Sequence, residues 1–332
     1  MDLIDVLMPV PLPPLVGEGL AATFHVHKSW LADDPIAFIA ALAPKVRAIA
    51  TGVSILAEGM SHPIDATFMA RFPHLGIVAN LGVGYDNIDA QWAGEHGIVV
   101  TNTPDVLTEE TADTAMGLLL CAVRQLPQAD AYLRAGKWQQ KPFALTTSLR
   151  GRTLGILGLG RIGKAIARRA EAFGLKIAYH GRSAQENMPY LYFPTLVGLA
   201  RACDILMVVA PGSDETRNIV DAEILKALGP NGILVNIARG SLVDEAALIA
   251  ALRAGTILTA ALDVFADEPN VPHDLIAMGQ VVLLPHVGSA SREARDAMSR
   301  LVVENLVSWA AGKGPLTPVE ETPWPPRAKS AE

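Results

Sequence analysis

One short stretch of this 332-residue chain constrains its fold more than any other. Residues 153–163 read TLGILGLGRIG, in which an apolar run leads into glycines at positions 158, 160 and 163. Apolar residues at helical spacing then continue to Gly174. This order predicts a buried strand, a tight turn and a helix that ends near Gly174, which together form one unit of a parallel α/β sheet.

The glycine spacing predicts that the turn binds a phosphate. Gly158 permits the tight turn, Gly160 leaves room for a pyrophosphate beside the backbone, and Gly163 lets the helix pack closely on its strand. Amides at the start of the helix then point at the anion. An ordinary glycine-rich turn is the alternative, but the flanking strand and helix favour a dinucleotide site. Its expected contacts are Gly158, Leu159, Gly160, Arg161, Ile162 and Gly163.

The residues after the second strand of this unit indicate which dinucleotide is preferred. That strand is predicted to end at Tyr179, where NAD-specific sites usually place an acid that binds the ribose 2′-hydroxyl. His180, Gly181, Arg182 and Ser183 stand there instead. A guanidinium with a hydroxyl and an imidazole suits a 2′-phosphate, because charge-assisted bonds match its oxygens. We therefore expect NADP(H) to be preferred, with NAD(H) left open as a second cofactor. A solvated arginine in a loop is the alternative.

Short apolar strands alternate with amphipathic helices along nearly the whole chain, which is typical of parallel sheets covered on both faces. The fold class is therefore α/β, with two doubly wound parallel-sheet domains. The predicted strands are Ile4–Met8, Thr23–His27, Ala48–Thr51, Ile77–Ala79 and Val99–Thr101 in the first unit, and Leu154–Leu157, Lys176–Tyr179, Ile205–Ala210, Ile233–Ile237, Ala260–Val264 and Val281–Leu284 in the second. Long helices are expected at 108–126 and 291–311, and the proline-rich tail from Gly314 is expected to be disordered or extended.

Composition excludes several classes of function. A formal charge of −7 argues against a nucleic-acid surface. No apolar run reaches the roughly 18 residues that a membrane helix needs, and the N-terminus lacks a basic signal region. Cys121 and Cys203 lie in apolar stretches and the histidines show no paired spacing, so no metal site is expected. These features indicate a soluble cytoplasmic protein with no membrane or nucleic-acid partner.

Three polar residues follow the last three strands of the second unit. Arg239 ends NIARG, Glu268 lies in ALDVFADEP and His286 lies in LLPHVGS. The carboxyl ends of parallel strands meet at one edge of a sheet, which is also the edge of the glycine turn. A cation, a carboxylate and an imidazole are therefore expected to converge at the reacting end of the dinucleotide. Each residue alone is ordinary in a loop, but three aligned strand ends favour a catalytic site.

The chain resembles the D-isomer-specific 2-hydroxyacid dehydrogenases, in their NADPH-dependent glyoxylate/hydroxypyruvate reductase branch. The resemblance rests on NLGVGYDNID from Asn80, TNTPDVLTEETAD from Thr101, GILGLGRIG from Gly155, NIARGSLVDEAAL from Asn236, ALDVFADEP from Ala261 and LPHVGSAS from Leu284. It implies a Rossmann-type NADP domain, residues 102–287, inserted in a flavodoxin-like substrate domain of residues 1–101 and 288–332. It also implies a homodimer, in which the helix and arm of residues 108–150 reach over the partner.

The same resemblance implies a role for each site residue. His286 would donate a proton to the keto oxygen, Glu268 would orient it and stabilise its charge, and Arg239 would hold the substrate carboxylate and carbonyl. The substrate would be a small 2-keto acid such as glyoxylate or hydroxypyruvate, reduced to a D-2-hydroxy acid. Its carboxylate would be bound by the amides of Leu81, Gly82, Val83 and Gly84. Further cofactor contacts would be Val106, Thr108, Pro211, Thr216, Ala238, Asp263 and Gly288.

One departure from the family pattern and two alternative functions leave the substrate open. Gln139, Gln140 and Lys141 follow Trp138 where similar reductases of the mammalian type carry a second tryptophan, so the partner's wall of the pocket can differ. 2-Ketogluconate and longer or aromatic 2-keto acids therefore stay in contention. An NAD-dependent relative acting on phosphoglycerate, formate or D-lactate is disfavoured by the missing acid at residues 180–183. A dinucleotide-sensing, corepressor-like protein is disfavoured by the absence of a basic patch.

Overall fold

A computed structural model describes residues 3–52 and 63–325. The chain divides into two compact units, which we call the terminal unit (Met1–Leu107 and Ser291–Glu332) and the central unit (Thr108–Ala290). These boundaries lie a few residues from those expected at 101 and 288. Each unit is built on its own parallel sheet.

The described part of the terminal unit holds a five-stranded parallel sheet in the order β2-β1-β3-β4-β5. Helices α2, α3 and α4 contribute to the apolar cluster on one face, and α12 contacts both β4 and α1. The strands are β1 (Ile4–Met8), β2 (Phe24–Lys28), β3 (Val46–Gly52), β4 (Ile77–Leu81) and β5 (Val99–Thr101). The helices are α1 (Pro14–Leu20), α2 (Pro35–Leu42), α3 (Ala66–Met69), α4 (Ala90–Glu95) and α12 (Arg292–Ala310).

The central unit holds a seven-stranded parallel sheet in the order β12-β11-β10-β9-β6-β7-β8. The strands are β6 (Thr153–Leu157), β7 (Lys176–His180), β8 (Leu191–Tyr192), β9 (Ile205–Val208), β10 (Ile233–Asn236), β11 (Thr259–Leu262) and β12 (Val282–Leu283). The helices are α5 (Thr108–Arg124), α6 (Leu126–Arg134), α7 (Arg161–Ala172), α8 (Leu196–Ala202), α9 (Ala222–Leu228), α10 (Glu245–Arg253) and α11 (His273–Ile276). The strand order reverses between β6 and β9, so a ligand site is expected at the carboxyl end of β6.

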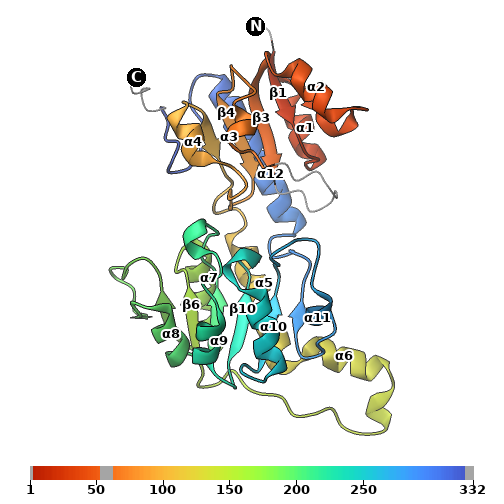
Figure 1. The fold of residues 1–332 in the computed structure, drawn as a ribbon, viewed down its shortest axis with the longest axis vertical. Coiled ribbons are helices and arrows are strands. Elements are labelled where there is room, and N and C mark those ends of the chain that lie inside the picture. Colours follow the sequence, from red (N-terminus) through yellow and green to blue (C-terminus); the bar gives the residue numbers. More distant parts are fainter. Residues whose placement is uncertain (1–2, 53–62, 326–332) are drawn as a thin grey trace. The chain divides into compact units, whose positions relative to one another are not determined.

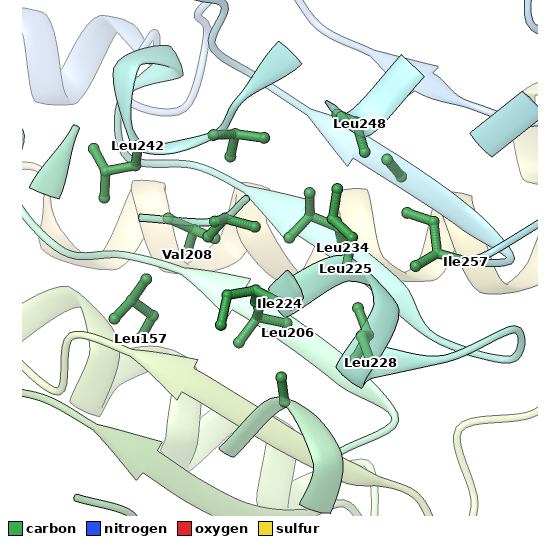
Figure 2. Packing of buried hydrophobic residues seen from close by; sticks show 14 of the residues in the cluster. Leu157, Leu206, Val208, Ile224, Leu225, Leu228, Leu234, Leu242, Leu248 and Ile257 are labelled. Carbon is green, nitrogen blue, oxygen red and sulfur yellow. The ribbon is translucent and has the colours of Figure 1, made fainter. Parts of the chain in front are cut away.

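Strands that are apolar on both faces explain the layers of the central unit. Helices α8, α9 and α10 pack on one face and helices α5 and α7 on the other. Figure 2 shows Leu206 and Leu234, from β9 and β10, beside Ile224 and Leu225 of α9. Burying each such side chain contributes about 1.5–3 kcal/mol. The core therefore holds the strand ends, and the loops that follow them, at fixed positions.

Two local features differ from the sequence-based expectations. The helix expected at 108–126 ends at Arg124, because Gln125 adopts a left-handed conformation (φ 50°) and a second helix, α6, starts after it. Strand β8 was not predicted, since two residues are too short to show a pattern. The tail from Gly314, which was expected to be disordered or extended, is described as far as Pro325. Residues 326–332 of that tail lie outside the described residues.

The C-terminal segment, by which we mean residues 315–322, adds to the edge of the terminal unit's sheet. Pro318 forms an antiparallel bridge with Thr101 of β5. The Val319 amide donates to the Val100 carbonyl at 2.9 Å. Extended backbone was one of the two expectations for this tail. Strand β5 is at the edge of the sheet, so without the segment its backbone N–H and C=O groups would lack partners, and pairing with them orders the segment. In Figure 1 this segment, in dark blue, lies beside α4 of its own unit.

Candidate active site

The three glycines of the turn after β6 differ in what surrounds them. Gly158 has a φ of +97°, and a Cβ there would lie 2.7 Å from the backbone of Ala210. A Cβ on Gly163 would collide with the carbonyl oxygen of Gly158. At Gly160, by contrast, no atom lies within 4 Å of a Cβ position. Packing within the protein thus accounts for Gly158 and Gly163, whereas Gly160 faces open space.

Helix α7 begins in that open space. Its N-cap is Gly160, which has no side chain, so no side chain caps the first amides of the helix. Such amides bind anions, since they carry the positive end of the helix dipole. Contacts within the protein fix the turn. The Leu159 side chain is buried, and the Leu159 carbonyl accepts a 2.8 Å hydrogen bond from Gln185 Nε2. Leu159 therefore offers its backbone, and not its side chain, to a ligand.

The end of β7 lies beside this turn. The Gly158 amide donates to the His180 carbonyl at 2.9 Å, and His180 Nδ1 lies 2.8 Å from the Phe193 carbonyl. Arg182 and Ser183 are exposed, and Arg182 makes no ion pair with the described residues. No carboxylate occurs from 180 to 183. A phosphate bound by residues 180–183 would thus meet a guanidinium and no carboxylate among these four residues.

His286 and Glu268 form a direct pair in the central unit. Glu268 follows β11 and His286 follows β12, and His286 Nδ1 lies 2.7 Å from Glu268 Oε2. The other carboxylate oxygen, Glu268 Oε1, accepts a hydrogen bond from the Phe265 amide at 3.0 Å. Both side chains are about three-quarters buried, with 24% and 22% of their surfaces exposed. The pair is therefore oriented by the backbone and partly shielded from water.

Arg239 lies within electrostatic reach of this pair. Burial alone would raise the pKa of the Glu268 carboxyl, but the hydrogen bond and charge of His286, the Phe265 amide and the charge of Arg239 outweigh it and lower that pKa. Arg239 follows β10, and its Nη1 donates to the Ala238 carbonyl at 2.9 Å. The structure thus brings together the cation, carboxylate and imidazole that the sequence placed after three strands.

Backbone hydrogen bonds to Asp263 fix the loop that carries His286. His286 has a φ of +52°, a conformation that a non-glycine residue rarely adopts. Its amide donates to the Asp263 carbonyl at 2.8 Å, and the amides of Val287 and Gly288 donate to Asp263 Oδ1 and Oδ2 at 2.7 and 2.8 Å. Asp263 is 1% exposed, and burial raises the pKa of its carboxyl despite these amides. We expected Asp263 beside the cofactor, and in the structure both its oxygens also hold this loop.

Two further residues, which the sequence analysis did not identify, form hydrogen bonds that hold the loops after the strands of the site. Asn236 Nδ2 donates to the Arg239 carbonyl at 2.8 Å, and Asn236 Oδ1 accepts from the Ala238 amide at 3.0 Å. Glu245 Oε1 accepts from the Ala266 amide at 2.8 Å. An asparagine at a strand end often closes a turn on itself, and that signal was available in NIARG. Glu245 gave no such signal, because its partner lies in a distant loop.

In the terminal unit, the loop after β4 turns its carbonyl groups inward. The Gly82 carbonyl accepts from Asn80 Nδ2 (3.3 Å) and from the Thr103 amide (2.9 Å). The Val83 carbonyl accepts from Asn102 Nδ2 at 2.8 Å, and the Gly84 carbonyl from Asn80 Nδ2 at 2.9 Å. The Gly82 amide donates to Thr103 Oγ1 at 3.1 Å, whereas the amides of Val83 and Gly84 have no acceptor among the described residues of this unit. Consecutive outward amides of this kind suit a carboxylate.

The flanking positions have structural partners of their own. Thr216 Oγ1 donates to the Pro211 carbonyl at 2.9 Å and belongs to a capping box with Ser213. Thr114 Oγ1 donates to the Gly288 carbonyl at 3.2 Å. Val106 is among the last residues of the terminal unit, and Thr108 is the first residue of α5. The hydroxyl groups of Thr216 and Thr114 thus have partners within the protein.

Within the described residues, no cluster of three or more histidine, cysteine or acidic side chains could hold a metal ion. No described helix is both long and apolar enough to span a membrane. Neither finding alters the site.

An uncapped helix after a glycine turn, with an imidazole–carboxylate pair at the same edge of one parallel sheet, is typical of nicotinamide-dinucleotide-dependent dehydrogenases. A family model, described as D-isomer specific 2-hydroxyacid dehydrogenase, NAD binding domain, matches residues 116–288. The chain belongs to this family of D-isomer specific 2-hydroxyacid dehydrogenases.

Relatives with similar sequences and structures span nearly the whole chain. Glyoxylate/hydroxypyruvate reductase A of Arabidopsis thaliana is 46% identical over 96% of this chain and all of its own length. Hydroxyphenylpyruvate reductase of Plectranthus scutellarioides is 43% identical over the same shares. The crystal structure of an NADPH-dependent glyoxylate/hydroxypyruvate reductase from Sinorhizobium meliloti, in complex with NADP and malonate, is 49% identical and has a TM-score of 0.90, covering 98% of this chain and all of that one.

Proposed function

We propose that this protein reduces small 2-keto acids, such as glyoxylate and hydroxypyruvate, to D-2-hydroxy acids with NADPH. The observation that carries the proposal is the His286–Glu268 pair, 2.7 Å apart and within electrostatic reach of Arg239, after β12 and β11 of the parallel sheet whose β6 leads into the glycine turn. Relatives that are named for this reaction, at 46% and 49% identity, support it.

The roles of the three residues follow from their chemistry. Because Glu268 engages Nδ1 of His286, the proton given to the keto oxygen would leave from Nε2. The Glu268 carboxylate favours the imidazolium from which that proton comes. The Arg239 guanidinium would hold the substrate carboxylate and stabilise the charge that develops on the keto oxygen. The amides of Val83 and Gly84, in the terminal unit, would bind the same carboxylate.

The central unit has a surface that fits NADPH, which when bound would supply the hydride. The open space at Gly160 and the uncapped start of α7 suit its pyrophosphate. The exposed Arg182, with Ser183 and His180, suits its 2′-phosphate, and no acid there would repel that group. On this basis we assign cofactor binding to the central unit and NADPH as the preferred cofactor.

One assay tests both substrate class and cofactor preference. NADPH and NADH oxidation should be followed with glyoxylate, hydroxypyruvate and 4-hydroxyphenylpyruvate, using wild type and Arg182→Ala. We expect NADPH to be oxidised fastest with the two small acids. Arg182→Ala should weaken NADPH affinity about tenfold or more while leaving NADH affinity unchanged, because only NADPH carries the phosphate. An unchanged ratio of the two affinities would rule out the role of Arg182.

The aromatic keto acid in this assay separates two named relatives. The Arabidopsis thaliana and Plectranthus scutellarioides proteins are 46% and 43% identical to this chain, but they are named for acids of different size. Gln139, Gln140 and Lys141 are the departures noted after Trp138. Faster turnover of 4-hydroxyphenylpyruvate would assign a larger pocket and overturn the small-acid proposal.

We also propose that the protein is a homodimer that works in the cytoplasm, where its free cysteines would stay reduced. Figure 1 shows the arm between α5 and β6 extending away from the sheet of its own unit. The arm exposes Leu126, Leu133, Trp138 and Leu145. The same unit has a hollow of about 450 Å³, lined by Thr114, Gly117, Leu118, Cys121, Pro127 and residues 281–284. A second copy of the chain would supply apolar side chains to this hollow and cover the arm.

A further inference from the structure

The C-terminal segment is linked to the loop after β4 by successive hydrogen bonds. Thr317 Oγ1 donates to the backbone carbonyl of Asn102 at 2.6 Å, and the Asn102 amide donates to the Thr317 carbonyl at 3.3 Å. The side chain of Asn102 then donates from Nδ2 to the Val83 carbonyl at 2.8 Å. One residue, Asn102, therefore joins the segment to the loop.

A buried asparagine of α12 fixes Thr317 in turn. Asn305 is 0% exposed, and its Nδ2 donates to the Leu301 carbonyl and to Thr317 Oγ1 at 2.8 and 2.9 Å. Its Oδ1 accepts from the amides of Leu316 and Thr317 at 2.8 and 2.9 Å. Every donor and acceptor of this side chain is thus used, which gives Thr317 one defined position.

The planar peptide bond links the hydrogen bond made by Asn102 to the direction of the next amide in the loop. In a trans peptide the C=O of one residue and the N–H of the next point in opposite directions, and the peptide between Val83 and Gly84 is trans. When Asn102 holds the Val83 carbonyl inward, the Gly84 amide must point outward. The Val83 amide is fixed in the same way by the Gly82 carbonyl, whose partners Asn80 and Thr103 lie close by in the core. Only the Gly84 amide depends on Asn102.

We propose that Thr317 and Asn305 are positioning residues for the substrate carboxylate, acting through Asn102 on the Gly84 amide. This inference rests on the proposed function, in which the amides of Val83 and Gly84 bind that carboxylate. Thr317 then supports the substrate site from the C-terminal segment, although none of the segment's residues belongs to the motifs that identify the family.

A second contact of the segment lies just beyond the loop. The Tyr85 hydroxyl donates to Glu321 Oε2 at 3.1 Å, and burial together with the Glu321 charge raises the pKa of Tyr85 to about 12. The tyrosine therefore stays a donor at physiological pH. The loop is held by the same segment at Val83, through Asn102, and again at Tyr85.

Thr322 provides a matched control on the same segment. Its hydroxyl accepts from the Val100 amide at 2.8 Å and lies 3.1 Å from the Val100 carbonyl, and the side chain is buried. It anchors the segment to β5, whereas Thr317 bonds to Asn102 just after β5, and the hydrogen bonds of Thr322 do not lead to residues 82–84. A purely structural role for the segment predicts similar behaviour of both threonine variants.

The experiment compares Thr317→Val, Thr317→Ser and Thr322→Val in the full-length protein. For Thr317→Val we expect the KM for glyoxylate to rise about tenfold, as for the loss of one well-aimed hydrogen bond to a carboxylate, with kcat within about twofold and NADPH affinity unchanged. Thr317→Ser keeps the hydroxyl and should restore the KM. Thr322→Val should lower the midpoint of thermal unfolding and leave the KM at the wild-type value.

Asn102→Ala is the second variant, because it removes the side chain that reaches Val83 and leaves the segment's backbone contacts in place. It should raise the KM as Thr317→Val does, so the inference is tested even if Thr317→Val does not fold. The inference is overturned, and the proposed function is not, if Asn102→Ala or a folded Thr317→Val keeps the wild-type KM. An equal rise of the KM in Thr322→Val has the same consequence. A wild-type protein that reduces no 2-keto acid overturns the proposed function and this inference with it.

Discussion

At the scale of single residues, the site depends on how one imidazole is held. Two constraints act on His286: Glu268 engages its ring at 2.7 Å, and Asp263 accepts hydrogen bonds from the residues that follow it. A left-handed non-glycine conformation costs on the order of 1–3 kcal/mol, and it persists where surrounding bonds over-determine it. The loop after β12 meets that condition, so the ring is aimed before a substrate arrives.

The Glu268 carboxylate should shape the pH dependence of reduction. Its pKa lies below the usual value of about 4.3, so it stays ionised from neutral pH down to that value, and its support of the imidazolium is lost only below it. Glu268→Gln removes the charge at all pH values. We expect kcat/KM for glyoxylate to fall about tenfold at neutral pH, because the charge that stabilises the proton donor is gone.

Steady-state reduction of glyoxylate from pH 5 to pH 9 measures this loss, with NADPH affinity as the control. The affinity should be unchanged, because Glu268 lies after β11 and not at the glycine turn. Full activity with an unchanged pH profile would remove Glu268 from the proposed mechanism.

At the scale of elements, the turn between β6 and α7 separates residues required for packing from those required for binding. The sequence motif treats its three glycines alike. The three glycines nevertheless have different surroundings, because only Gly160 has no neighbouring atom within 4 Å of a Cβ position.

Gly160→Ala and Gly163→Ala should therefore have opposite effects. Gly160→Ala should leave the unfolding free energy of the cofactor-free protein unchanged and weaken NADPH binding about tenfold, or ~1.4 kcal/mol. Gly163→Ala should destabilise the protein by about 1–3 kcal/mol, because its Cβ meets the Gly158 carbonyl oxygen. Denaturant unfolding and fluorescence titration with NADPH check both. NADPH binding by Gly160→Ala at wild-type strength would refute the assignment of that space to the cofactor.

Much of the element order could be predicted because strands and helices leave a pattern in the sequence. Strand β1 was predicted with its bounds, and the helix from Gly160 was predicted to end near Gly174. The turn at Gln125 and the order of the C-terminal segment leave no such pattern. The first depends on one backbone angle, and the second on hydrogen bonds to β5, which lies far away in the sequence.

The same reasoning explains the limits at the site. Arg239, Glu268 and His286 could be predicted because each follows a strand, and parallel strands end at one edge. Asn305 and Thr317 could not, because their connection to Val83 passes through Asn102, some 200 positions earlier in the chain. Their side chains are common in turns and helix surfaces, and only the fold brings them together.

At the scale of the whole molecule, the proposed homodimer accounts for apolar surface that one chain leaves exposed. Leu145 is fully exposed, and Trp138 is 67% exposed. The half-buried Cys121 lines the hollow of the same unit, and burial raises the pKa of its thiol.

Sedimentation velocity tests the dimer. Wild type should sediment as a dimer at micromolar concentration, and the double variant Trp138→Glu, Leu145→Glu as a monomer, because charges would enter an apolar interface. Leu31→Glu is the control, since Leu31 is 72% exposed and belongs to the terminal unit. Cys121 should react faster with a thiol reagent in the double variant. A monomeric wild type would contradict the proposal.

The central claim, that this site transfers hydride from NADPH to one face of a 2-keto acid, is tested most directly by the product. Hydroxypyruvate should be reduced to completion with NADPH, and the glycerate formed should be resolved by chiral chromatography. The account predicts D-glycerate in an amount equal to the NADPH consumed. L-glycerate, or NADPH binding with no glycerate formed, would contradict it.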